Sequence, residues 1–598
     1  MMLHCTPPNE QYIPNPALGY LKGFLEAKGI HVKTVYWNLI LEQKIQQFQK
    51  GFEHYAEDTR FFPVLSALYM VKHLLKDSCD AVTPLDFLYL SAFSKEELSE
   101  MIESIKEYID HHIKKNDLHK TDIAGFTLKT LQWPMSAYLI GILRELNPDI
   151  TIVIGGIINK FQGAAFMKMV DADYALWGEG EYPLWHLVTA LREGASLKKV
   201  PNLIYRDNGA LTATALQDEY LPLDQYPFAD HSDYFEAFQK FMVDPHYPVS
   251  IPIWGSRSCP WNKCRFCTLN EEYTYRTRSP ENIVEEIVYQ SEEYNIDEFI
   301  FVDTEFAGTK KRFKALLKLL IQMSAARMRT YHFCAEISPL LIDQETAKYM
   351  QLASFEKTQI GFEAVTDSLL EKMCKRQKFA HNIQALKLSS QYDLELHGLN
   401  IIREIPTETV EDILESCTNL RFLRFYLRKH PLTPSFLRLY KGAPFYEDVK
   451  EDERKIWNKN SFWEEVALTE LVSDENKFDF FGFSKMHHNP QWDTFETLLK
   501  FYIKHGCTYE WIEFLDGSSV EEKEPVKGIY MFDRDETDLL IFCDEIRNFF
   551  EIKDRFPHLS ENRLREMLHE LKEAGMLYYG EDLYISVLAA DRRKILSL

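Results

Sequence analysis

The sequence predicts an α/β protein with two successive parallel-sheet domains and a mainly helical C-terminal region. Two observations predict the sheets: short apolar segments alternate with amphipathic ones over residues 1–215, and the alternation resumes over 249–445 after a linker at 216–248. A third observation concerns size, because 598 residues with 45% hydrophobic content are enough for three or four domains with cores of their own.

Charge and cysteine usage exclude several classes of partner. The formal net charge is −23 and no Lys/Arg cluster offers the basic surface that phosphate binding requires, so we expect no nucleic-acid partner. No apolar run approaches membrane-spanning length, and the N-terminus lacks the basic start of a secretory signal, so we expect no membrane partner. Ten cysteines without a regular framework fit a reducing, cytoplasmic location.

The first domain begins as a βαβ unit, in which a strand is followed by a helix that stops at Gly29 and by a second strand. Residues 39–117 then interrupt the alternation with a mostly helical insertion, to which we assign no chemistry. We expect parallel strands at residues 3–8, 32–38, 122–128, 151–156 and 172–177, and a closing hairpin at 202–209. This order predicts a doubly wound domain.

The loops that follow three of these strands contain glycines or small polar residues. They cover residues 127–130, 155–159 and 178–181, and all three emerge at the same edge of a parallel sheet. Glycine lets the backbone approach a flat ligand closely, although glycines also end strands where no ligand binds. We therefore regard this edge as a candidate ligand site.

Three cysteines, Cys259, Cys264 and Cys267, lie within nine residues and follow a short buried strand at 250–254. Such a group is typical of a soft-metal site. No fourth Cys or His lies nearby to complete a tetrahedral zinc site, so we interpret the three as ligands of one iron–sulfur cube with one open iron. S-adenosylmethionine (SAM), which chelates through its amino and carboxylate groups, is the candidate ligand of that iron. A zinc knuckle with a distant fourth ligand is the alternative.

Residues 249–445 continue as a run of β/α units, which predicts a full or partial parallel barrel. Carboxylates recur just after the strands, at the edge where the chemistry of such barrels collects. A ligand with an ammonium, a sulfonium and ribose hydroxyls would explain them. These residues are Asp303, Glu305, Glu336, Glu363 and Glu404.

The remaining residues divide into two parts. Residues 446–530 are aromatic and acidic without clear periodicity, and we expect an irregular or helical region of unassigned role. Residues 531–598 predict three helices and a hairpin, which together form a winged-helix-like unit. The last helix, 560–575, mixes acids with its few bases, so DNA binding is not expected. A simple packing domain is one interpretation of this unit.

The spacing Cys-x4-Cys-x2-Cys, with Phe266 before the last cysteine, resembles the radical SAM superfamily, whose usual spacing is one residue shorter. The resemblance implies a [4Fe-4S] cluster held by the three cysteines, with SAM bound beside it. It also implies that Glu336 and Glu363 contact the amino or ribose groups of SAM and that Phe266 flanks the adenine. Asp303 and Glu305 are further candidates for SAM binding.

A doubly wound domain directly before this barrel resembles the Rossmann-like cobalamin-binding domain of cobalamin-dependent radical SAM enzymes. The Asp-x-His-x-x-Gly motif, by which some other cobalamin proteins supply a histidine to cobalt, is absent. The resemblance therefore implies a corrinoid whose lower face lacks a protein imidazole. The residues that it places against cobalamin are Thr127, Leu128, Gly155, Gly156, Ile157, Gly178, Glu179 and Gly180.

The order of the parts, from about Pro14 to Val587, resembles the cobalamin-binding radical SAM proteins that mature ribosomally made peptides. It departs from them at residues 402–406, where relatives usually have a glycine-rich turn. The resemblance implies a peptide substrate, a leader peptide that the winged-helix-like unit binds as an extra strand, and an external electron donor. It implies C-methylation of an unactivated carbon, in which a 5′-deoxyadenosyl radical removes hydrogen and methylcobalamin delivers the methyl group.

Two alternatives stay open at the level of the sequence. The first is a cobalamin-dependent radical SAM enzyme that oxidises, rearranges or cross-links its substrate without methylating it. The second is a zinc-bearing winged-helix interaction protein without catalytic activity.

Overall fold

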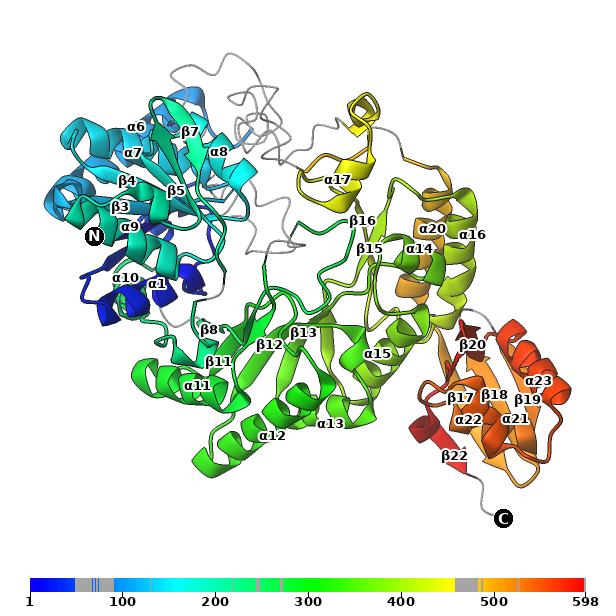
Figure 1. Cartoon of the computed structure of the whole chain (residues 1–598). Coiled ribbons are helices and arrows are strands. Elements are labelled where there is room, and N and C mark those ends of the chain that lie inside the picture. Colours follow the sequence, from blue (N-terminus) through cyan, green and yellow to red (C-terminus); the bar gives the residue numbers. More distant parts are fainter. Residues whose placement is uncertain are drawn as a thin grey trace.

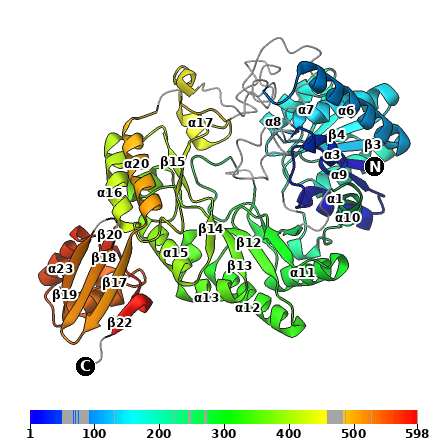
Figure 2. The ribbon, with the colours of Figure 1, turned by 180° about the vertical axis from the view of Figure 1, so that it is seen from behind.

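The computed structural model of the protein is shown in Figure 1. It describes residues 1–48, 91–129, 131–218, 220–242, 248–268, 273–457, 482–485, 488–523 and 527–595, together with the single residues Ala67, Met70, Leu74 and Pro525. Most of the expected helical insertion, and most of 458–487, therefore lie outside the described residues. Figures 1 and 2 show the N-terminal domain and the C-terminal unit on opposite sides of the central barrel.

The N-terminal domain is built on one seven-stranded sheet with the order β2-β1-β3-β4-β5-β6-β7. Its first five strands run parallel, and β6 and β7 add antiparallel at one edge. The strands are β1 (Met2–Cys5), β2 (Lys33–Tyr36), β3 (Ile123–Thr127), β4 (Thr151–Ile157), β5 (Tyr174–Trp177), β6 (Leu203–Asp207) and β7 (Ala210–Ala213). The order 2-1-3-4-5 is that of a doubly wound sheet, with its topological switch between β1 and β3.

Helices cover both faces of this sheet. On one face α1 (Pro16–Ala27) and α9 (Glu181–Glu193) bury apolar residues in a common cluster. On the other face α7 (Trp133–Leu146) and α8 (Lys160–Met169) pack into a second cluster, which continues into the barrel. The domain also contains α2 (Trp37–Ile40), α3 (Glu42–Gln46) and α6 (Lys95–Lys115), and α10 (Ser232–Phe241) follows in the linker.

The central domain is a partial parallel barrel. Five parallel strands form a sheet with the order β14-β13-β12-β11-β8, and the parallel pair β15 and β16 continues it through a bridge between Glu363 and Ile401. The strands are β8 (Ser250–Ile253), β11 (Glu298–Phe301), β12 (His332–Ile337), β13 (Phe355–Ile360), β14 (Glu395–His397), β15 (Asn400–Arg403) and β16 (Thr433–Phe436). The α/β fold predicted from the alternation is confirmed.

The barrel helices follow their strands on the outer face, as Figure 2 shows for α11, α12 and α13. They are α11 (Pro280–Tyr294), α12 (Lys310–Arg327), α13 (Gln344–Leu352), α14 (Asp367–Lys372), α15 (Phe379–Gln391) and α16 (Val410–Asn419). The Ser279 hydroxyl accepts a hydrogen bond from the Asn282 amide at 3.2 Å and Pro280 occupies the first turn, so both residues begin α11. A short ribbon of β9 (Ser256–Arg257) and β10 (Arg276–Thr277) lies between β8 and α11.

The C-terminal unit has its own core and extends further toward the N-terminus than the expected 531–598. Its sheet has the order β19-β18-β17-β22, with β17 (Thr508–Phe514), β18 (Gly517–Lys523), β19 (Gly528–Asp533) and β22 (Arg593–Ile595). Three helices follow, α21 (Arg534–Phe542), α22 (Phe549–Arg555) and α23 (Glu561–Glu573), and then the hairpin of β20 (Leu577–Gly580) and β21 (Leu583–Ser586). The region expected to be irregular or helical, 446–530, thus holds two of these strands as well as α20 (Gln491–His505), and α17 (Pro444–Asp448) crosses its start.

The sequence missed β17 and β18 because their alternation is carried by mixed side chains. In β17, Trp511 and the charged Glu513 are both buried, whereas the apolar Ile512 between them is half-buried, so hydrophobicity alone shows no period of two. Among the described residues, no helix combines the length and the hydropathy that a membrane span needs.

Candidate functional site

The three cysteines lie on the loop between β9 and β10, at the C-terminal end of the first barrel strand. All three thiols are half-buried. The loop is fixed to the far side of the barrel, where the Arg265 amide donates to the carbonyl of Met373 at 3.0 Å and the Trp261 indole donates to the carbonyl of Cys374 at 2.6 Å. Its position matches the expectation that ligand chemistry collects at this end of the strands.

A cavity of about 420 Å³ opens at the C-terminal ends of the barrel strands, beside this loop. Cys259 and Cys264 form part of its wall, and the carboxylates Glu305, Glu336 and Glu363 come from three successive strand ends. The volume is in the range of pockets that enclose a small-molecule ligand. Two of the three cysteines and three of the five acidic residues predicted from the sequence therefore line the same cavity.

The carboxylates of the cavity differ in their surroundings. Partial desolvation, followed by repulsion from Glu363, raises the pKa of Glu336. Glu363 forms an ion pair with Lys375 at 3.1 Å. Burial alone would lower the pKa of Lys375, but attraction to Glu363 and to the Cys264 thiolate outweighs it and raises that pKa. The Lys375 ammonium also lies 5.8 Å from the centre of the Phe266 ring, which packs beside the cavity rather than in its wall.

Glu305 is the most unusual carboxylate in the cavity. Its side chain is buried, and burial raises its pKa to about 7 although the backbone amides of Ser338 and Ala307 act in the opposite direction. Its Oε1 atom has no hydrogen-bond partner among the described residues. A buried acceptor without a partner is costly, so a donor from a bound ligand would stabilise it.

Two of the five strand-end carboxylates lie outside the cavity. Asp303 accepts hydrogen bonds from the Gly255 amide at 2.9 Å and from the Ser256 hydroxyl at 2.6 Å, so it holds the start of the cysteine segment to the end of β11. Glu404 accepts from the Asn489 amide at 2.6 Å and lies beyond β15. Both side chains therefore have structural partners among the described residues.

Sequence reasoning missed several residues of this wall. They are Gln359, Lys375, Arg376 and Gln377. Gln359 lies on β13, two residues before Gly361, and the other three lie in the connection from α14 to α15. Two cations and one amide in a helix–helix connection give no local signal, because only the closure of the barrel brings them to the strand ends.

A second cavity, of about 170 Å³, lies at the C-terminal edge of the N-terminal sheet. Of the eight residues assigned to this edge, Thr127, Gly155, Gly156, Gly178, Glu179 and Gly180 line it. Leu128 and Ile157 do not, because their side chains are buried in the core. Trp254 and Arg257 complete the wall, so this cavity lies between the N-terminal domain and the segment that carries the cysteines.

The glycines of this second cavity leave room for a ligand at one position in particular. A Cβ atom added to Gly155 would have no heavy atom within 4 Å, whereas one added to Gly156, whose φ is +76°, would lie 2.8 Å from the Thr127 hydroxyl. Glu179 Oε2 is buried and has no hydrogen-bond partner among the described residues. Open backbone beside an unpartnered acceptor fits a ligand that is flat and carries amide or hydroxyl donors.

The arrangement of the thiols also bears on the kind of metal site. Burial raises the pKa of Cys264 to about 12, so its thiolate needs a strong positive charge nearby. Among the described residues, no group of three His, Cys, Asp or Glu converges on one metal-ion position. Each thiolate of an iron–sulfur cube binds a different iron, which suits thiols that are spread around a loop.

Residues 255–417 match the profile of the Radical SAM superfamily. The protein is therefore an enzyme that contains a radical SAM domain. The prediction of a radical SAM enzyme is confirmed, and the alternative of a non-catalytic zinc protein is wrong. The matched segment contains the three cysteines and the cavity carboxylates of the barrel.

The chain is similar in sequence to two curated proteins and in fold to one solved structure. This chain is 27% identical over 339 residues to an uncharacterized methyltransferase of Pyrococcus horikoshii. The matched region covers 55% of this chain and 71% of that protein. This chain is also 26% identical over 305 residues to the anaerobic magnesium-protoporphyrin IX monomethyl ester cyclase of Rubrivivax gelatinosus. That matched region covers 50% of this chain and 53% of the cyclase. The radical SAM enzyme thus spans only about half of the cyclase.

The fold is similar to that of the radical SAM methyltransferase TsrM from Kitasatospora setae, solved with cobalamin and a [4Fe-4S] cluster bound. The TM-score is 0.51 at 15% sequence identity, and the match covers 77% of this chain and 76% of TsrM. The similarity to the TsrM fold extends beyond the barrel, because residues 255–417 make up a much smaller share of the chain than the 77% that this match covers.

Proposed function

We propose that this radical SAM enzyme is cobalamin-dependent and methylates an unactivated carbon of a ribosomally made peptide. The observation that carries the proposal is the position of the second cavity. It combines the glycine-rich edge of a doubly wound domain with Trp254 and Arg257, which directly precede the cysteines. Two ligand sites that share one short segment of chain suit a reaction that uses two cofactors in succession.

The residues fit the three cofactors in distinct ways. Cys259, Cys264 and Cys267 would hold the [4Fe-4S] cluster, and the glycine-rich edge with Glu179 would hold the corrin. The wall that would bind SAM contains Glu305, Glu336, Gln359 and Glu363. When bound, the cluster and SAM supply a 5′-deoxyadenosyl radical, and the corrin supplies the methyl group.

The protein's own contribution is binding, orientation and charge. The unpartnered Oε1 of Glu305 can accept a hydrogen bond from the ammonium of an amino acid group. Glu363 would bind ribose hydroxyls of SAM through its carboxylate, and its partner Lys375 is attracted to the Cys264 thiolate as well as to Glu363. Among the residues that the structure describes, no histidine lines the second cavity.

The corrin site is tested by filling the open space at Gly155. Gly155→Leu is expected to lower cobalamin retention about tenfold, because its side chain would occupy space that no protein atom fills. The measurement is the visible absorption of the protein after anaerobic reconstitution with hydroxocobalamin and gel filtration. Gly141→Leu on the exposed side of α7, which also has an empty environment, is the matched control. Equal retention by wild type and Gly155→Leu would contradict the assignment.

We also propose that the substrate peptide binds to the C-terminal unit as an added strand. β19 is an edge strand of its sheet, and Ile529 and Met531 on it are 71% and 66% exposed. An open edge with apolar side chains at alternate positions is the surface on which peptides add to sheets.

The peptide site is tested with peptides selected from a display library against the full-length enzyme. Met531→Asp is expected to weaken their binding about tenfold, measured by fluorescence anisotropy. Leu515→Asp, at the exposed turn between β17 and β18, is the control because it removes an apolar side chain that is even more exposed than Met531 but lies away from the edge. Selected peptides that bind both variants as tightly as wild type would place the peptide site elsewhere.

The proposal includes an external electron donor and a cytoplasmic location. Pro260 and Lys263 of the cysteine loop are exposed, so a reducing partner can approach the cluster from that side. Lys263 and the exposed Arg376 give this side positive charges that suit an acidic redox protein. Thiols that must stay reduced to bind iron fit a reducing compartment.

A second candidate function is a cobalamin-dependent reaction without methylation, such as oxidation, rearrangement or cross-linking. The similarity to the magnesium-protoporphyrin ester cyclase favours it, because that name describes a ring closure. The cavities are the same in either case, so the products distinguish the two functions.

A further inference from the structure

The ribbon at the base of the cysteine loop carries two arginines that pair with the N-terminal domain. β9 and β10 run antiparallel, and Arg257 and Arg276 are direct cross-strand partners. Like charges in this position destabilise a ribbon unless anions compensate them. The turn from β5 to α9 provides two anions: Arg257 donates to Glu181 at 2.6 Å, and Arg276 forms an ion pair with Glu179.

Both ion pairs are largely shielded from water. The side chains of Arg257 and Glu181 are 13% and 3% exposed, and those of Arg276 and Glu179 are 14% and 10% exposed. Removing one partner from such a pair leaves an uncompensated charge in a poorly solvated place. These contacts therefore hold the ribbon to the turn far more firmly than surface ion pairs would.

The chain next to β10 makes further contacts with the N-terminal domain. The Tyr273 ring packs against Gly178, where φ is +73° and an added Cβ would lie 2.8 Å from the ring. The Tyr273 hydroxyl donates to the carbonyl of Ile158, and the Thr274 amide donates to Asp218. The last part of the cysteine loop thus rests on the N-terminal domain.

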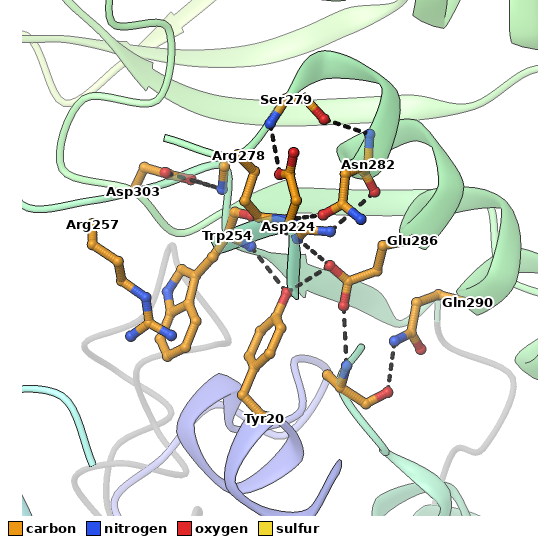
Figure 3. Close-up of polar contacts among 12 residues, drawn as sticks. Tyr20, Asp224, Trp254, Arg257, Arg278, Ser279, Asn282, Glu286, Gln290 and Asp303 are labelled. Atoms are coloured by element: carbon orange, nitrogen blue, oxygen red, sulfur yellow. Dashed lines mark hydrogen bonds and ion pairs between the residues drawn. The ribbon is translucent and has the colours of Figure 1, made fainter. Parts of the chain in front are cut away.

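The chain next to β9 is held from both domains. The Arg257 guanidinium lies 3.4 Å from the centre of the Trp254 ring, and Trp254 stacks on Tyr20 of α1 at 4.4 Å with an interplanar angle of 14°. Figure 3 shows these three side chains together with Asp303, which accepts a hydrogen bond from the Gly255 amide. The base of the loop is therefore fixed between α1 and the end of β11.

We propose that the Arg257–Glu181 and Arg276–Glu179 pairs, which we call the double clamp, set the separation between the cysteine loop and the ligand edge of the N-terminal domain. In this role the four side chains act by position. Glu179 pairs with Arg276 through Oε1, so its Oε2 stays available to the second cavity. A substrate that is activated in the barrel cavity and modified at the corrin edge must reach both sites, so their separation has to be fixed. Naming the two cofactors rests on the proposed function, whereas the clamp itself rests on the contacts of the ribbon.

The test compares Arg276→Glu, Glu179→Arg and the double variant that exchanges the two charges, all in the full-length protein. Hydrogen–deuterium exchange of the amides in 256–258 and 273–277 is expected to rise at least about tenfold in the single variants and to fall again in the double variant. The control exchanges the charges of Arg327 and Glu292, an ion pair between α12 and α11 whose side chains are 37% and 61% exposed. This control is expected to leave exchange unchanged.

A second readout follows the distance between the cofactors. In protein loaded with cluster and cobalamin, the reduced cluster speeds the spin relaxation of cob(II)alamin, and this effect should weaken in the single variants and recover in the double variant. Wild-type exchange rates in the single variants, or an increase spread over the whole chain, would overturn the positioning role. If wild-type protein retains no corrin, the proposed function fails, and the exchange measurement still decides whether the clamp exists.

Discussion

Replacing Cys264 with alanine is expected to remove the iron–sulfur cluster and to reduce 5′-deoxyadenosine formation from SAM to background. The thiol is half-buried in the wall of the barrel cavity, and a cube cannot be held there by the two remaining cysteines alone with full occupancy. The measurement is the iron and labile sulfide content after anaerobic reconstitution, followed by quantification of 5′-deoxyadenosine.

The matched control for this substitution is Cys417→Ala. Cys417 is also half-buried but lies on α16, far along the chain from the loop, and it is not in the wall of either cavity. Its removal should leave iron content and product unchanged. A Cys264→Ala protein that kept a full complement of iron and still cleaved SAM would refute the ligand assignment.

The largest expected effect on stability comes from Glu286 on α11. Its side chain is fully buried, forms an ion pair with Arg278, and accepts hydrogen bonds from the Tyr20 hydroxyl at 3.0 Å and the Ala229 amide at 3.1 Å (Figure 3). Glu286→Leu would leave Arg278 buried without its counter-charge, which typically costs about 3–5 kcal/mol. We expect a lower midpoint of thermal unfolding and weaker attachment of the N-terminal domain to the barrel.

The adjacent Glu285 provides the control for this prediction. It is exposed on the same helix, so Glu285→Leu should shift the midpoint very little. Differential scanning fluorimetry of both variants measures the difference. Equal midpoints for the two variants would show that the buried network between the domains contributes no net stability.

The parts of the site that could be predicted from the sequence are those with a local signal. The cysteine spacing marks the cluster loop, and the carboxylates at the C-terminal ends of β12 and β13 follow from where parallel strands end. Lys375 and Arg257 gave no such signal, because their roles depend on partners, Glu363 and Glu181, that lie elsewhere in the chain.

Side-chain direction explains why two residues predicted to line the ligand edge of the N-terminal domain do not line it. Leu128 and Ile157 lie next to residues that line the second cavity, yet both side chains are buried in the core. Neighbouring residues of an extended chain point to opposite sides, and the pairing of β4 with β5 shifts register between Ile154 and Ile157. A loop can therefore be assigned to a site from sequence more easily than its individual residues.

In the C-terminal unit the helices could be predicted from the sequence, but the first strands could not. Its helices were visible from caps and spacing, since Ser560 begins α23 and Gly575, with φ of +68°, follows its end. Its first strands were missed because buried charged residues such as Glu513 and Glu522 interrupt the apolar pattern. These carboxylates pair with arginines, among them Arg534 and Arg424, that only the folded chain brings near.

Analysis of the reaction products tests most directly whether one chain combines radical SAM chemistry with cobalamin. Full-length protein is reconstituted anaerobically with iron, sulfide and hydroxocobalamin, and then supplied with SAM, a reductant and a peptide selected for binding. We predict 5′-deoxyadenosine together with S-adenosylhomocysteine, because a methylated corrin must be replenished from SAM. Formation of 5′-deoxyadenosine alone, with corrin bound, would favour the non-methylating reaction. A protein that retains no corrin and forms neither product would contradict the account.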